Sequence, residues 1–118
     1  MAAGRDNFLD YIPRYNTRNT WSVNEAGIVV VRVHNTGFFN RVAQFFFKRP
    51  EYSDIKLDEF GSFVWKQMDG TRNVYEIGIK VKENFGEAAE PLYERLSQFI
   101  QILHRNAYIV YVNKIKTQ

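Results

Sequence analysis

The sequence of 118 residues contains no cysteine and only two histidines, His34 and His104, which lie far apart along the chain. The lack of cysteine excludes a disulfide scaffold, a thiolate nucleophile and any cysteine-ligated zinc or iron–sulfur site. Long apolar runs are missing as well, since even Ile28–Val33 ends far short of a membrane span. The first residues also lack the apolar core of a secretory signal. We therefore expect a cytoplasmic protein with no metal site and no membrane partner.

Neither basic nor acidic residues strongly predominate in the sequence. The chain carries 16 basic and 13 acidic residues, a net charge of +3, which falls short of the clustered basic face of a dedicated nucleic-acid binder. Residues 1–50 and 88–118 are positive overall, whereas residues 51–87 are negative. If the two positive flanks meet in space, they favour an acidic partner.

The motifs of common enzyme active sites are absent too. The chain has no Gly-x-Gly-x-x-Gly, no glycine-rich phosphate loop ending in Lys-Ser/Thr, and at Gly61-Ser62 no true nucleophile elbow. The acidic pair Asp58-Glu59 is better explained as a helix cap with a first-turn glutamate. His104 suits the C-terminal end of a helix. We therefore expect that the protein is not an enzyme and has no catalytic residue and no cofactor.

The first half of the chain has patterns typical of strands. The β-branched run Ile28–Val33 and the turn residues before it predict an antiparallel hairpin over about 20–33. Apolar residues at helical spacing over Phe38–Phe47 predict a short amphipathic helix, which Pro50 stops. Residues Tyr52–Leu57 alternate well enough to form a third strand.

The second half predicts three helices, over about 58–69, 73–86 and 91–106. In the second of these, Asn73 and Glu76 have the spacing of a capping box. The other residues whose types suit helix ends are Asp58, Gly70, Gly86 and Pro91.

Strands followed by three short helices, and a last β-prone stretch Tyr108–Val112, predict an α+β fold of winged-helix type. We expect one domain over residues 1–118. In it a small antiparallel three-stranded sheet packs on a three-helix bundle, with the extra amphipathic helix before the third strand. The apolar face of the third helix spans about 180°, more than the ~100° that docking on one side needs. The surplus predicts a second contact or an apolar wall for a ligand.

An edge strand and a wide helix face can together form a peptide-binding groove. If Tyr52–Leu57 lies at the edge of the sheet, its main-chain groups can pair with an extended peptide. The third helix would then form the far wall. Considered singly, Leu92, Leu96 and Phe99 are better explained as core residues, so the groove depends on the width of the apolar arc.

Several short motifs occur in an order that resembles the PqqD family. The run Leu57–Ile77 reads LDEFGSFVWKQMDGTRNVYEI, close to the family's Leu-Asn-x-x-Gly, helix and Asp-Gly-x-x-Thr-Val-x-x-Ile. Phe85-Gly86 matches the end of the next helix. Leu92–Leu103 and Arg105–Ile109 match the closing helix and its tail. The resemblance covers about residues 50–110, and the combination of motifs gives it its specificity.

The resemblance implies a non-catalytic protein, of the kind involved in PQQ biosynthesis and known as a precursor-peptide recognition element. Such peptide chaperones bind the leader of a ribosomally made precursor peptide and present it to a radical S-adenosylmethionine or other modifying enzyme. The leader adds as a strand beside the third strand and packs on the third helix. Carried onto this chain, the implied peptide-binding residues are Tyr52, Ser53, Asp54, Ile55, Lys56 and Leu57, with Leu92, Tyr93, Arg95, Leu96, Phe99 and Ile100.

The chain departs from the family pattern at three motif positions: Asp58 replaces asparagine, Asn73 threonine and Ala107 glycine. The first two are competent caps, but alanine is strained if the position needs a positive φ. The segment before Tyr52 is also longer and more aromatic than a plain connection. It leaves open whether this segment covers the sheet, joins two copies into a homodimer or binds the modifying enzyme.

Within the peptide groove, Arg95 and Lys56 are the residues that we expect to recognise acidic leader side chains. Tyr93, Leu96 and Ile100 are those that we expect to hold an apolar anchor. The alternative function is a winged-helix DNA-binding regulator, although the mixed charges of the second and third helices disfavour nucleic acid. A third possible function is that of a purely structural subunit of a larger complex.

Overall fold

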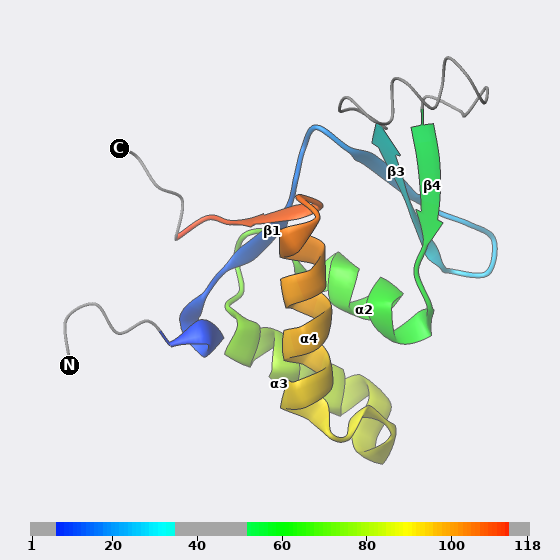
Figure 1. Ribbon diagram of the computed structural model, residues 1–118. Coiled ribbons are helices and arrows are strands. Elements are labelled where there is room, and N and C mark those ends of the chain that lie inside the picture. The colour runs from blue at the N-terminus through cyan, green and yellow to red at the C-terminus, as the bar shows by residue number, and fades with distance from the viewer. Residues whose placement is uncertain (1–6, 35–51, 114–118) are drawn as a thin grey trace. The chain divides into compact units, whose positions relative to one another are not determined.

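The structure, a computed structural model, describes residues 7–34 and 52–113 (Figure 1). Tertiary contacts divide the chain into two units. We call them the sheet unit, residues 17–62, and the helical unit, residues 1–16 together with 63–118. The helical unit is therefore built from two stretches of chain that the sheet unit separates in the sequence.

Three antiparallel strands form the sheet, β2 (Thr20–Val23), β3 (Val29–His34) and β4 (Tyr52–Lys56), in the order β2-β3-β4. Side chains alternate between the two faces of a strand, and on β3 Val29 and Val31 share the buried face. The predicted hairpin over 20–33 and the predicted strand at Tyr52–Leu57 are confirmed. The helix predicted over Phe38–Phe47 lies outside the described residues.

A buried hydroxyl joins β3 to the start of α2 (Glu59–Gln67). Ser62 is 2% exposed, and its Oγ accepts a hydrogen bond from the Val29 N–H at 2.8 Å. The Asp58 carboxylate accepts the Gly61 N–H at 2.7 Å, which confirms the predicted helix cap. Ser62 therefore has a structural role, because its hydroxyl is the partner of a buried main-chain amide.

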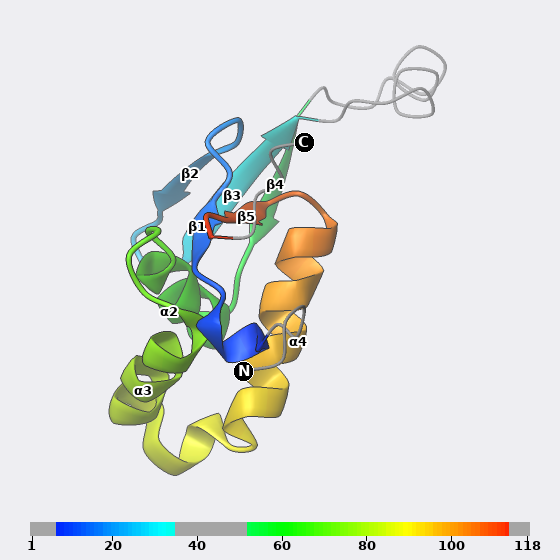
Figure 2. The ribbon, with the colours of Figure 1, turned by 90° about the vertical axis from the view of Figure 1, so that its left-hand side faces the viewer.

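The helical unit holds the last part of α2 and six further elements: η1 (Phe8–Asp10), β1 (Pro13–Tyr15), α3 (Val74–Phe85), η2 (Gly86–Ala89), α4 (Leu92–Arg105) and β5 (Ile109–Tyr111). Helices α3 and α4 lie side by side (Figure 2). Their inward side chains and residues of α2 are buried. The core contains Val64, Trp65, Val74, Ile77, Val81, Leu96, Ile100 and Leu103.

The ends of α3 and α4 largely follow the capping rules. The Asn73 side chain accepts the Glu76 N–H at 2.8 Å, and the Glu76 carboxylate accepts the Asn73 N–H at 2.8 Å. The predicted capping box is thus confirmed, and Gly86 ends α3 with φ +58°. Helix α4 begins just after Pro91 and ends just before Asn106, close to the predicted bounds.

The sequence patterns did not predict β1, which pairs antiparallel with β5, Pro13 opposite Tyr111. The Val112 N–H donates to the Ile12 C=O at 2.8 Å, and the Asn113 side chain accepts the Ile12 N–H at 2.9 Å. A strand of three residues has no room for alternation, and its partner lies almost at the other end of the chain. Local patterns therefore carry no signal for it.

The α+β class and its small antiparallel sheets are confirmed. The winged-helix arrangement, the packing of a sheet on a three-helix bundle and the single domain over residues 1–118 stay predictions. No helix in the described part of the chain is long and apolar enough to cross a membrane.

Candidate functional site

Strand β4 is an outer strand, as the peptide-groove hypothesis requires. It pairs with β3 on one side, and no strand among the described residues pairs with its other side. The Leu57 N–H donates to the Val29 C=O at 3.0 Å. Because hydrogen-bonded and non-bonded pairs alternate along an antiparallel ladder, Ile55 bonds toward β3, whereas the main-chain groups of Asp54 and Lys56 point away from it. An added strand would find these outward groups at every second residue.

The residues predicted on this strand alternate in exposure: Tyr52, Asp54 and Lys56 are exposed, Ser53 and Ile55 are half-buried, and Leu57 is buried. Arg32 on β3 donates two hydrogen bonds to the Asp54 carboxylate, at 2.8 and 3.1 Å. This contact lowers the pKa of Asp54 and raises the pKa of Arg32. Within the described part of the chain, Lys56 has no such charged partner. It is the β4 charge that remains available to a ligand.

The six residues predicted on α4 differ widely in exposure: Leu92, Leu96 and Ile100 are buried, Arg95 and Phe99 are half-buried, and Tyr93 is exposed. The Arg95 guanidinium donates to the Ala88 C=O at 2.7 Å. Part of the wide apolar arc therefore fills the core of the helical unit, and Ile102 at its margin is exposed. Since β4 belongs to the sheet unit and α4 to the helical unit, a groove that uses both stays a prediction.

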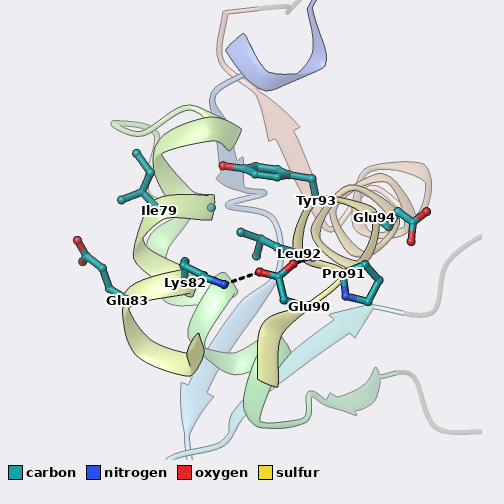
Figure 3. A pocket seen from close by; sticks show the side chains of 9 residues that line it. Ile79, Lys82, Glu83, Glu90, Pro91, Leu92, Tyr93 and Glu94 are labelled. Carbon is teal, nitrogen blue, oxygen red and sulfur yellow. Dashed lines mark hydrogen bonds and ion pairs between the residues drawn. The ribbon is translucent and has the colours of Figure 1, made fainter. Parts of the chain in front are cut away.

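A pocket of about 580 Å³, which we call the α3–α4 groove, was not predicted from the sequence (Figure 3). This volume is typical of ligand pockets. The residues that line it are Gly78, Ile79, Lys82, Glu83, Glu90, Pro91, Leu92, Tyr93 and Glu94. A Cβ atom at Gly78 would lie 2.7 Å from the Tyr93 ring, so the glycine lets this ring approach α3. A glycine inside a regular helix pattern was the one available signal.

A charge pair and two tyrosine rings shape this groove. Lys82 Nζ lies 2.6 Å from Glu90 Oε2, and this contact raises the pKa of Lys82 and lowers the pKa of Glu90 (Figure 3). The Tyr93 ring stacks on Tyr75 with centroids 6.5 Å apart. Burial raises the pKa of Tyr93. The Lys82–Glu90 pair is therefore ionised and the Tyr93 phenol is neutral at pH 7.

A family model described as coenzyme PQQ synthesis protein D (PqqD) matches residues 48–109, more than half of the chain. The chain belongs to the PqqD family. The PqqD match runs through β4, α2, α3, α4 and the start of β5, whereas β1, β2 and β3 precede it. No curated protein and no solved structure matches the chain significantly.

The PqqD motifs occupy turns and helix ends in this chain. Asp69 accepts the Thr71 N–H at 3.1 Å, and Gly70 beside it has φ +88°. Ala107, where the family pattern has glycine, has φ +63°. The expectation that this position strains an alanine is confirmed, since the left-handed region costs an L-residue about 1 kcal/mol or more.

The other candidates for chemistry in this PqqD protein also have structural contacts. His104, near the end of α4, stacks on Tyr111 with ring centroids 4.3 Å apart. In the part of the chain that the structure covers, no three His, Asp or Glu side chains gather closely enough to hold a metal ion. Among the described residues, the candidate functional surfaces are thus the β4 edge and the α3–α4 groove.

Proposed function

We propose that this PqqD-family protein is a non-catalytic accessory protein of the cytoplasm. It binds the leader of a ribosomally made precursor peptide and presents it to a modifying enzyme of the radical S-adenosylmethionine type. The family description, a protein of coenzyme PQQ synthesis, supports this role. The observation that carries the proposal is the outer edge of β4, where Asp54 and Lys56 turn their main-chain groups away from β3.

An extended leader adds beside β4 as a further strand of the sheet. Main-chain hydrogen bonds supply the affinity, and alternate side chains set the register. Lys56 is exposed on the strand to which the leader adds, so its ammonium group recognises an acidic side chain of the leader. Asp54 is already bound to Arg32, which keeps its negative charge from repelling that side chain.

On α4, Tyr93 is the predicted contact that is best suited to a test. Leu96 and Ile100 have no exposed surface, so a charge at either position would unfold the core before it reported on binding. Arg95 remains a second candidate for an acidic leader side chain, although its guanidinium also donates to the Ala88 C=O. Tyr93→Ala should lower the affinity for the leader without unfolding the chain.

The sharpest test of leader binding at β4 removes one main-chain N–H that points away from β3. Lys56→Pro removes the N–H that points away from β3, and it leaves the bonds of Ile55 to β3 in place. We expect the affinity for the leader to fall by about tenfold or more, because one main-chain bond is lost and the ring obstructs the added strand. Calorimetric titration with synthetic peptides covering the short reading frames beside the gene measures this, and Lys56→Ala controls for the lost charge.

The other outer strand supplies a matched control. Along β2 the pairing of Asn24 N–H with Ile28 C=O fixes the alternation, so the Val23 amide also points outward. Val23→Pro therefore changes an edge amide on the same sheet without touching β4. Loss of binding in Val23→Pro, with none in Lys56→Pro, would contradict the assignment to β4.

The salt dependence of binding separates a leader from nucleic acid. Strand addition should lose little affinity between low and moderate salt, whereas contacts to several phosphates weaken steeply. Saturable one-to-one peptide binding that survives the higher salt is the expected result. Affinity for duplex DNA that collapses with salt, together with no peptide binding, would support a regulator instead.

A further inference from the structure

The α3–α4 groove combines apolar walls with exposed aromatic surface on the helical unit. Ile79 is 41% exposed and Tyr93 is 36% exposed. Tyr75, which stacks on Tyr93, is 50% exposed and extends the apolar surface along α3. Ile79 and Tyr93 thus meet solvent at a pocket that Leu92 also lines (Figure 3). Exposed apolar side chains beside a pocket make this surface a candidate interaction site.

The charges around the groove are unbalanced. Its one cation, Lys82, is already paired with Glu90, and its Nζ also lies 3.8 Å from Glu87 Oε2. Glu83 on α3 and Glu94 on α4 have no hydrogen bond or ion pair to any described residue. Two unpaired carboxylates therefore flank apolar walls, on a chain whose net charge is +3. The complementary ligand is an aromatic segment that carries adjacent cations.

The chain itself contains such a segment. Residues 45–49 read Phe-Phe-Phe-Lys-Arg, three aromatic side chains followed by two cations, and they lie outside the described residues. We propose that the α3–α4 groove binds residues 45–49 of a second copy of this chain. The aromatic side chains enter between Ile79 and Tyr93, and the cations pair with Glu83 and Glu94. Reciprocal exchange of the segment between two copies closes a dimer.

The probe is a fluorescent peptide of residues 43–50 titrated into the full chain and followed by anisotropy. Sedimentation of the unlabelled protein over a range of concentrations reports on the dimer. The double variant Glu83→Lys with Glu94→Lys should lower the affinity for the peptide by about tenfold, since two attractions between charges become repulsions. It should raise the dissociation constant of the dimer by a similar factor. A peptide carrying Lys48→Glu and Arg49→Glu should recover affinity for that double variant.

Two further variants keep the test decisive. Ile79→Ser leaves every charge in place and, because Ile79 is largely exposed, should not disturb the fold; we expect about fivefold weaker peptide binding from the lost apolar contact. Glu25→Lys reverses an exposed charge in the turn between β2 and β3, outside the groove, and should leave the affinity unchanged.

Three results would overturn the proposal. The first is equal peptide affinity for the wild type, the double charge variant and Ile79→Ser. The second is equal weakening by Glu25→Lys, which would show a general charge effect. The third is a protein that stays monomeric at all concentrations, which would exclude a second copy even if the peptide bound. None of these results bears on Lys56→Pro, so leader binding at β4 stands or falls separately.

Discussion

The β4 edge and the α3–α4 groove offer partners two different kinds of surface. At β4 the proposed recognition groups are the main-chain amides and carbonyls of Asp54 and Lys56, which every peptide can match. In the groove they are side chains, the ring of Tyr93 and the carboxylates of Glu83 and Glu94. The edge therefore tolerates many sequences in one backbone shape, whereas the groove demands particular side chains.

The two units also differ in what holds them. In the sheet unit, one hydroxyl of Ser62 is the partner of the Val29 amide where the strand ladder ends. In the helical unit, stability is spread over a buried core, the Asn73 capping box and stacked rings. Because the Ser62 hydroxyl is the partner of a buried main-chain amide, the loss of this one oxygen atom should destabilise the sheet unit more than the loss of one exposed side-chain contact.

The largest expected effect is therefore in the sheet unit. Ser62→Ala leaves the buried Val29 N–H without a partner and should lower the free energy of unfolding by about 2 kcal/mol. Urea denaturation measures this loss. Ser22→Ala, on the exposed part of β2, is the control and should cost less than about 0.5 kcal/mol. Equal losses of unfolding free energy in Ser62→Ala and Ser22→Ala would show that the buried hydrogen bond of Ser62 does not make the sheet unit especially sensitive.

Alkaline pH probes the helical unit next. Burial raises the pKa of Tyr111 from 10.0 to about 12. Between these values the unfolded chain loses the proton while the folded chain keeps it, so the free energy of unfolding falls as pH rises from about 10 to about 12. The expected loss is at most about 2 kcal/mol.

Tyr111→Phe isolates this effect, since it removes the ionising group and keeps the ring. Urea denaturation between pH 9 and 12, values chosen to bracket the shift, should show a shallower decline for the variant than for the wild type. Parallel declines would mean that Tyr111 ionises equally in both states.

The smallest expected effect is a gain. Ala107→Gly relieves the left-handed backbone at φ +63° and should raise the free energy of unfolding by about 1 kcal/mol. Gly70→Ala is the reciprocal variant, because Gly70 has φ +88° and an added Cβ would meet only ordinary contacts with Arg14. It should lower stability by about the same amount. A loss in Ala107→Gly would show that other contacts of the alanine outweigh the strain.

Local sequence rules predicted the helices of the second half well. The Asn73–Glu76 capping box, the Asp58 cap and the left-handed Gly70 are properties of a few neighbouring residues, and each is confirmed. The same holds for the hairpin over 20–33, because β-branched residues and its turn lie close together.

Features that need distant partners were not predictable in this way. β1 is too short for a pattern, and β5 lies far along the chain. The α3–α4 groove depends on Gly78 facing Tyr93 across two helices, which no spacing rule encodes. On α4, the expectation that Leu96 taken singly is a core residue is confirmed, but the width of the apolar arc did not reveal that Ile100 is fully buried while Tyr93 and Ile102 are exposed.

The pairing of β1 with β5 has a consequence for synthesis on the ribosome. Ile12 and Asn113, which bond to each other, are 101 positions apart, whereas the sheet unit is one continuous stretch. Segments fold as units in the order in which they emerge. The sheet unit can therefore form early, while residues 7–16, though made before it, wait for β5. A segment that leaves the ribosome before the sheet unit thus reaches its place after it.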